Sequence, residues 1–311
     1  MKRIPIIIDV DTGTDDAICI TAALLHQEQL DIKAFTTVCG NVTIDKTSKN
    51  TLDVVSFLGW HLPVAIGAAK PLVQELKIAK SHGNSGLGDV ILPPSQQGFA
   101  EMTADELIYY HAVQEQGELQ LLGVGPLTNL ALAIQKHPDI VPLIKKITIM
   151  GGGLYGGNMT MTSEFNIYND PDAAKIVFDS GIELTMIGLD VTLKPKLPEW
   201  VVEKMSKAEN PYGILISRIF DFMKRRKVEI GGDEPNLHDV IALASIVRPD
   251  IITTKDFYMT VETQGTITRG MTIADFNNVE EKTPNVHAAV DIDINGFWEW
   301  LVGMIKQNEK E

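Results

Sequence analysis

The feature that most constrains this chain is an apolar run near the N-terminus that passes directly into a cluster of acidic residues. Residues 6–8 are isoleucines, and the next eight residues include four carboxylates: Asp9, Asp11, Asp15 and Asp16. A short β-branched run without polar alternation is typical of a strand buried on both faces, as in a parallel sheet. Gly13 lets the backbone turn, so that the last two aspartates fall in the first turn of a helix. The sequence therefore predicts a strand, a turn and a helix that place these carboxylates at one edge of a sheet.

Such a cluster needs compensating positive charge. No lysine or arginine occurs between Arg3 and Lys33, and gathered carboxylates repel one another unless they are protonated or hold a cation. Oxygen ligands suit Ca²⁺ or Mg²⁺, and the crowding favours Ca²⁺, which takes roughly six to eight oxygens. The alternative is that Asp15 and Asp16 only stabilise the start of a helix. Because that alternative leaves the other two acids unexplained, we favour a metal site.

Strand-like and helix-like segments alternate along the rest of the chain. Apolar strands are expected at 32–38, 64–66, 119–124, 146–150, 184–189 and 286–292, with helical patterns between most of them. This alternation predicts an α/β fold with an open, mostly parallel sheet and helices on both faces. Residues 198–227 form one helical pattern that ends in a basic cluster, and residues 259–272 predict a small antiparallel hairpin. No repeat or linker interrupts the chain, so we expect a single domain over residues 1–311.

Polar residues follow several predicted strands. Asn41 follows the strand at 32–38, His238-Asp239 stands at a predicted helix start, and His82 lies in a loop rich in glycine and serine. Taken singly, each fits turn or capping chemistry. In open α/β sheets, however, ligands bind outside the carboxyl ends of the strands, where these residues converge. We do not favour a dinucleotide site, because the acids that follow the first predicted strand would repel a pyrophosphate.

Composition limits the possible partners. The net charge of -14 and the pI near 4.9 argue against nucleic acid or an anionic membrane. A small, uncharged or cationic substrate is easier to accommodate. The chain has two cysteines, Cys19 and Cys39, and no apolar run typical of a signal peptide or a membrane span. We expect buried thiols rather than a disulfide, and a cytoplasmic protein.

Taken together, the motifs resemble the nucleoside hydrolases, in particular the inosine-uridine preferring family. The family signature D-x-D-x-G-x-D-D is matched by residues 9–16, and further matches follow in the same order at Thr37 to Asn41, His82-Gly83, Gly125 to Asn129, Met150 to Gly153, Glu164 to Asn166, Gly188-Leu189-Asp190 and His238-Asp239. The resemblance implies hydrolysis of the N-glycosidic bond of ribonucleosides to ribose and free base. We expect broad purine and pyrimidine specificity, and a homodimer or homotetramer.

The resemblance also implies roles for individual residues. Asp11, Asp16 and Asp239 would hold a Ca²⁺ together with the main-chain carbonyl of Val124, and Asp11 would take a proton from the attacking water. His238 would protonate a departing purine. The implied substrate contacts are Asp15, Asn41 and Asn166 at the ribose 2′ and 3′ hydroxyls, Asn158 and Glu164 at the 5′ hydroxyl, and His82 and Met150 elsewhere on the nucleoside.

Some positions depart from the family pattern. Thr12 and Val240 stand where the family often has proline, and Val240 could shift the start of the helix that carries His238. The segment from 220 to 237 would face the base. Some relatives place tyrosines in this segment, whereas this chain has Phe222, Arg225 and Arg226.

Two other functions are considered. A phosphatase of the haloacid dehalogenase type also begins with an apolar strand and D-x-D, but it needs a small β-branched residue where this chain has Gly13. A non-enzymatic calcium-binding module is the second alternative. Calcium loops of that kind are short, repeated and usually secreted, whereas this acidic stretch is single and follows a buried strand.

Overall fold

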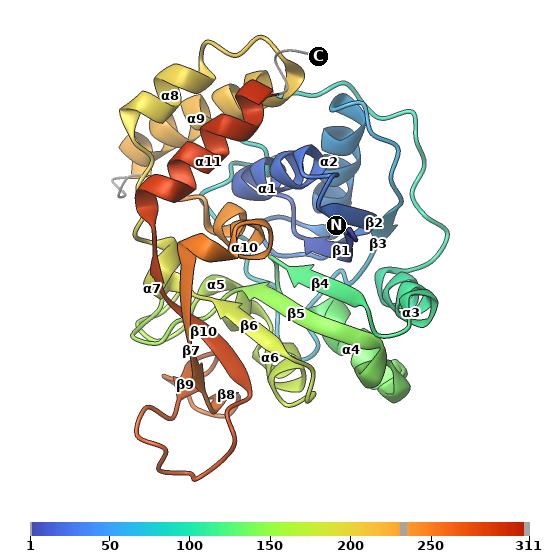
Figure 1. The fold of residues 1–311 in the computed structure, drawn as a ribbon, viewed down its shortest axis with the longest axis vertical. Helices are drawn as coiled ribbons and strands as arrows, with labels where there is room; N and C mark the ends of the chain where they lie inside the picture. Colours follow the sequence, from blue (N-terminus) through green and yellow to red (C-terminus); the bar gives the residue numbers. More distant parts are fainter. Residues whose placement is uncertain (1, 231–234, 308–311) are drawn as a thin grey trace.

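The computed structural model describes residues 2–230 and 235–307, and an eight-stranded sheet runs through it (Figure 1). In sheet order, the strands are β3 (Val64–Ile66), β2 (Leu30–Thr37), β1 (Ile4–Val10), β4 (Leu119–Gly123), β5 (Ile144–Met150), β6 (Leu184–Ile187), β10 (Val286–Ile292) and β7 (Ile252–Phe257). β7 pairs antiparallel with β10, and the other neighbouring strands are parallel. A separate antiparallel pair consists of β8 (Met259–Val261) and β9 (Thr272–Ala274).

Helices cover both faces of the sheet (Figure 1). One face carries α1 (Thr14–Leu25), α2 (Ile44–Phe57), α8 (Glu199–Met205), α9 (Pro211–Ile230), α10 (His238–Val247) and α11 (Ile294–Gln307). The other carries α3 (Ala104–Glu115), α4 (Thr128–Lys136) and α6 (Pro171–Phe178). The remaining short helices are α5 (Phe165–Asn169), α7 (Leu189–Thr192) and the 3₁₀ turns Pro138–Leu143 and Pro249–Ile251. Ile6 and Ile8 belong to the core on one face and Ile7 to the core on the other, so β1 is buried on both sides.

The predicted architecture is confirmed, including the small antiparallel pair. Two details differ from the expectation. The helical pattern at 198–227 is two helices, because the Asn210 side chain accepts a hydrogen bond from the backbone N–H of Gly213 and Pro211 starts a new helix. The edge strand β7 was not anticipated, since most of its residues are exposed and carry no core pattern.

The centre of the sheet positions the candidate site. In the strand register, Asp9 of β1 lies beside Thr36 of β2 and Gly123 of β4. The three segments that follow these strands, residues 11–13, 38–41 and 124–126, therefore meet at one edge. α10 packs on α1 and brings its first turn to the same edge.

Two simpler expectations can be compared directly with the structure. Cys19 and Cys39 are free and buried, as predicted. Among the helices in the described part of the chain, none is both long enough and apolar enough to cross a membrane.

Candidate active site

Asp16 organises the turn between β1 and α1. Its Oδ1 accepts a hydrogen bond from the backbone N–H of Asp11 at 3.1 Å, and its Oδ2 accepts one from the N–H of Gly13 at 2.9 Å. As the third residue of α1, Asp16 thus satisfies donors that the start of a helix leaves free. The local sequence folds this way because an acid in the first helical turn can reach back over a flexible glycine.

The segment after β2 contacts the same acids. The Asn41 backbone N–H donates to Asp11 Oδ2 at 2.7 Å, and its side-chain amide donates to Asp16 Oδ2 at 3.0 Å. Gly40 allows this approach, because a Cβ there would lie 2.1 Å from Asp11 Oδ2. A Cβ on Gly125, after β4, would lie 3.0 Å from the same carboxylate. The Asp11 carboxylate is therefore packed against the backbone of two glycines, and a side chain at either position would collide with it.

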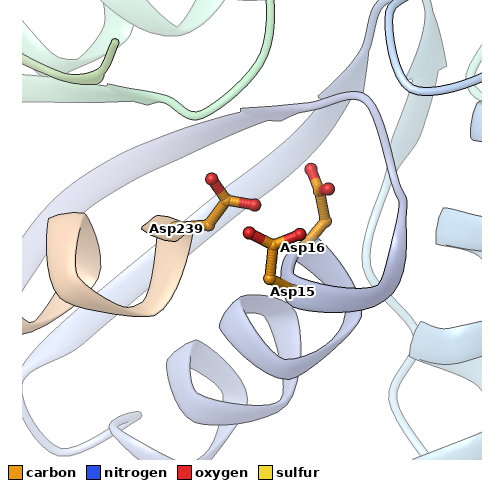
Figure 2. Close-up of side chains that lie close together, drawn as sticks. All are labelled: Asp15, Asp16 and Asp239. Carbon is orange, nitrogen blue, oxygen red and sulfur yellow. The ribbon is translucent and has the colours of Figure 1, made fainter. Parts of the chain in front are cut away.

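Asp239, which lies much later in the sequence, joins the acids at the start of α1. Carboxylate oxygens of Asp15, Asp16 and Asp239, called here the acidic trio, lie within 4.8 Å of one another. Figure 2 shows the first two side chains rising from α1 and the third reaching toward them from α10. Val240 is fully buried, and α10 begins at His238. With valine in place of the family's proline, His238 and Asp239 therefore still lie in the first turn of the helix.

The electrostatics of the cluster fit a bound divalent cation. Burial, with the charge of Asp15 adding to it, raises the pKa of Asp16 to about 7. Burial and neighbouring carboxylates likewise raise the pKa values of Asp11 and Asp239 well above the usual range. In the described part of the chain, no lysine or arginine forms an ion pair with any of these carboxylates. Buried, uncompensated oxygen donors are the ligand set of a hard cation, so these residues could hold a metal ion.

Asp9 does not join the cluster. Its Oδ1 accepts hydrogen bonds from the Thr36 hydroxyl and the Asn129 side-chain amide, while its Oδ2 is buried and has no partner. Burial raises the pKa of Asp9 to about 7. The expectation that all four N-terminal acids gather at one edge is therefore met by three of them. Asp9 instead ties β1 to β2 and α4.

A cavity of about 790 Å³ opens above the acidic trio. The sequence-predicted residues that line it are Asp15, Asn41, His82, Val124, Met150, Asn158, Glu164, Asn166, His238 and Asp239. Asp11 and Asp16 do not line the cavity themselves, but both accept hydrogen bonds from Asn41, which does. The volume lies within the usual range for small-molecule sites. The structure thus brings the residues to which the resemblance assigns roles to one place, from strand ends and loops far apart along the chain, whereas Asp9 stays outside.

The wall opposite α1 is built by α5 and the loop before it. Glu164 caps α5, and its carboxylate accepts the N–H groups of Asn166, Ile167 and Gly152. Burial raises the pKa of Glu164 to about 7. The Asn166 amide donates to the carbonyl oxygens of Val124 at 2.8 Å and Met150 at 3.1 Å, which leaves its own oxygen available.

Two histidines face the cavity, each bonded to a threonine. The Nδ1 of His82 lies 2.9 Å from the Thr14 hydroxyl and 3.9 Å from Asp15 Oδ1. The Nδ1 of His238 lies 2.8 Å from the Thr192 hydroxyl. Burial lowers the pKa of both imidazoles, which favours their neutral forms.

The C-terminal half of α9 contacts the loop that carries His82. Arg225 pairs with Asp89 at 2.5 Å, and the Phe222 ring packs so closely on Gly88 that a Cβ there would lie 2.3 Å from it. Arg226 donates to the carbonyl of Lys80 and also lines the cavity. Part of the segment expected to face the base, 231–234, lies outside the described residues.

Several cavity residues were not anticipated from the sequence. They include Thr14, Met159 and Leu193, together with Thr192 behind His238, whereas Met223, Lys227 and Asn236 lie in the 220–237 segment that was expected to face the base. Thr192 follows a strand end as Asn41 does, so its position carried a usable signal. Thr14 and Leu193 lie at helix ends and Met159 in a loop, where residue type alone does not distinguish a site from a surface.

The whole chain is similar to proteins of known activity. A family model described as inosine-uridine preferring nucleoside hydrolase matches residues 6–299. The pyrimidine-specific ribonucleoside hydrolase RihA of Salmonella schwarzengrund is 41% identical over 308 residues, which cover 97% of this chain and 98% of that protein. RihA of Escherichia coli SMS-3-5 is 40% identical over the same share of each chain.

Solved structures agree with these similarities. A purine-preferring ribonucleoside hydrolase from Gardnerella vaginalis is 31% identical with a TM-score of 0.90, over 98% of this chain and 99% of that chain. The plant nucleoside hydrolase PpNRh1 is 29% identical with a TM-score of 0.91, again over 98% and 99% of the two chains.

The packing of Gly40 against Asp11 gives a direct test of the cation site. Gly40→Ala should weaken Ca²⁺ binding by roughly tenfold or more, because the new Cβ displaces the Asp11 carboxylate. Isothermal titration calorimetry measures the affinity. Gly98→Ala is the matched control, since its Cβ would meet no atom within 4 Å. Equal affinities in the two variants would contradict a role for Asp11 at the metal.

Proposed function

The chain belongs to the inosine-uridine preferring nucleoside hydrolase family, and we propose that the cavity above the acidic trio is where it cleaves the N-glycosidic bond of ribonucleosides. Membership of the family makes the chain a ribonucleoside hydrolase, an enzyme that acts on N-glycosyl compounds. The observation that carries the assignment of the site is the buried, uncompensated trio at the floor of a cavity sized for a small molecule.

We assign the cation as Ca²⁺, held by Asp11, Asp16, Asp239 and the carbonyl oxygen of Val124. Asp15 lies close enough to share in the site. The all-oxygen donor set supports a hard cation, and the number of carboxylates supports Ca²⁺ over Mg²⁺. When bound, such a cation supplies positive charge that makes a neighbouring water more acidic.

Asp11 is the proposed general base. Burial and the charge of Asp16 raise the pKa of Asp11, so its carboxylate holds a proton more readily than an exposed aspartate does. The Asn41 backbone N–H holds Oδ2 in place, which leaves Oδ1 to accept a proton from the attacking water. The acids around it also stabilise the positive charge that develops on the ribosyl group as the bond breaks.

The ribose would be held by groups on both walls of the cavity. Asp15 and Asn41 on one side and Asn166 on the other are the proposed partners of the 2′ and 3′ hydroxyls. Asn158 and Glu164 are the proposed partners of the 5′ hydroxyl, with Met150 beneath the sugar. Hydrogen bonds of Asn166 to two carbonyl oxygens fix its amide, which supports a role in orienting the substrate.

The departing base would leave on the side of His82 and His238. A histidine that donates to the base lowers the cost of the negative charge the base acquires. A neutral imidazole near pH 7 can give such a hydrogen bond without first taking up a proton. The contacts of His82 and His238 to threonines support this placement, because they hold both rings at the cavity wall.

Base specificity is the finer part of the proposal. We propose broad specificity that includes uridine, cytidine and inosine. Relatives at about 40% identity are named pyrimidine-specific and a structural relative is named purine-preferring, so the family spans both preferences. Initial rates on a panel of purine and pyrimidine ribonucleosides, with deoxyribonucleoside controls, measure the preference. Turnover of p-nitrophenyl phosphate without release of any base would instead support the phosphatase alternative.

We also propose that the enzyme is a cytoplasmic homodimer or homotetramer. Sedimentation equilibrium with and without Ca²⁺ tests the assembly. A purely monomeric enzyme with full activity would contradict it.

Asp11→Asn should reduce hydrolysis of both uridine and inosine by on the order of 10² to 10⁴, because the amide cannot accept the proton from water. Release of reducing sugar measures the rate, and circular dichroism checks the fold. Asp45→Asn, an exposed position on α2, is the control. Retention of more than a tenth of the activity would count against Asp11 as the base.

His238→Ala should lower the rate with inosine more than the rate with p-nitrophenyl riboside, whose leaving group needs no proton. The comparison uses kcat/KM for the two substrates in wild type and variant. Equal losses on both substrates would remove His238 from the role of acid.

A further inference from the structure

The proton on the imidazole of His82 has a definite position in this structure. The backbone N–H of Thr14 points at Nδ1 of His82 with an N···N distance of 3.1 Å, and the Thr14 hydroxyl lies 2.9 Å from the same atom. A backbone N–H can only donate, so Nδ1 must be the acceptor. In a neutral imidazole the proton is then on Nε2.

The donor comes from a helix terminus. Thr14 is the first residue of α1, and the first N–H groups of a helix have no partner within the helix. His82 is therefore bonded to a group that would otherwise be unsatisfied in a buried place, since Thr14 is only 2% exposed. Gly13 permits the approach, because a Cβ there would lie 2.6 Å from Nδ1.

The other nitrogen remains for a ligand. Among the described residues, none accepts a hydrogen bond from Nε2 of His82, and the residue lines the cavity. In the alternative tautomer, Nδ1–H could donate to the Thr14 hydroxyl at 2.9 Å, while Asp15 Oδ1 at 3.9 Å is too far for a direct hydrogen bond. The Thr14 N–H opposes that tautomer, because two hydrogen-bond donors, the N–H and the Nδ1–H, would then point at each other.

We propose that Thr14 is a positioning residue that fixes His82 as the Nε2–H tautomer, so that a neutral imidazole donates a hydrogen bond to the departing base. This inference rests on the proposed function for its substrate but not for its geometry. The acceptor would be a base that carries a carbonyl oxygen on the ring carbon bonded to the glycosidic nitrogen. Uridine and cytidine have such an oxygen at C2. That oxygen gains negative charge as the bond breaks, so a donor there acts more strongly in the transition state.

His238 provides a contrast within the same cavity. Among the described residues, the hydrogen-bond partner of its Nδ1 is the hydroxyl of Thr192, and a hydroxyl can donate or accept. The structure therefore leaves the His238 tautomer free to change, whereas that of His82 is held by a backbone group. The two histidines are distinguished by their partners rather than by their burial.

The test reads the tautomer directly. The protein is labelled with ¹⁵N-histidine, and the His82 signals are assigned by their loss in His82→Gln. In wild type, the Nδ1 resonance should be that of an unprotonated nitrogen and the Nε2 resonance that of a protonated one. A protonated Nδ1 in the wild type overturns the proposal without any variant.

Substitutions at Thr14 separate its two donors. Thr14→Val removes the hydroxyl and Thr14→Ser keeps it, but both retain the backbone N–H, so both should keep the tautomer. Thr14→Pro removes the N–H and the hydroxyl together. Proline is favoured at the first position of a helix, and α6 and α9 of this chain already begin with it. In Thr14→Pro the proton should move to Nδ1, facing Asp15; an unchanged Nδ1 resonance overturns the proposal.

Kinetics test the consequence for the reaction. Thr14→Pro should lower kcat/KM for uridine by on the order of 10², as expected when a donor to developing charge is lost. Combined with His82→Ala, it should cause no further loss, because Thr14 acts through His82. Additive losses would contradict the positioning role. If wild type releases no base from any nucleoside, the proposed function fails, while the NMR result still decides the tautomer.

Discussion

Repulsion among buried carboxylates is the constraint on which this structure depends. A parallel sheet collects the ends of its strands at one edge, and here that edge gathers Asp11 and the acidic trio away from water. Hydrogen bonds from the backbone of Asp11, Gly13 and Asn41 satisfy part of the oxygen lone pairs. They do not neutralise the charge, as the raised pKa values record. The proposed divalent cation would offset much of it, which would make the ion part of the fold as well as of the chemistry.

The N-terminal part of the site could be predicted because its signals are local. An apolar β-branched run, a glycine and two acids at a helix start together permit one arrangement, and the structure has it. Asp9 shows where that reasoning ends. The sequence predicted that Asp9 gathers with the other acids at one edge of the sheet, but β1 ends at Val10, so Asp9 lies within the strand and Asp11 in the turn after it. Asp9 finds its partners on β2 and α4, which no local pattern reveals.

Residues far along the chain were harder to predict from chemistry alone. His238-Asp239 reads equally well as a helix cap, and only the packing of α10 on α1 makes Asp239 a member of the trio. The order of motifs along the chain, rather than any one motif, supplied that pairing. Thr14 illustrates the remaining gap, because its importance comes from a backbone N–H that every residue but proline possesses. Contacts of that kind depend on tertiary placement and leave no trace in residue type.

The acidic trio has a consequence for how the chain reaches its native state. It joins α1, the first helix along the sequence, to α10, which follows much later in the chain, and contacts of such sequence separation are slow to form. The proposed ion, seated between α1 and α10, would act as a cross-link, and it would stabilise only molecules in which both helices have docked. Partly folded chains would gain nothing from it. The ion proposed for the reaction would thereby favour fully folded molecules over partly folded ones.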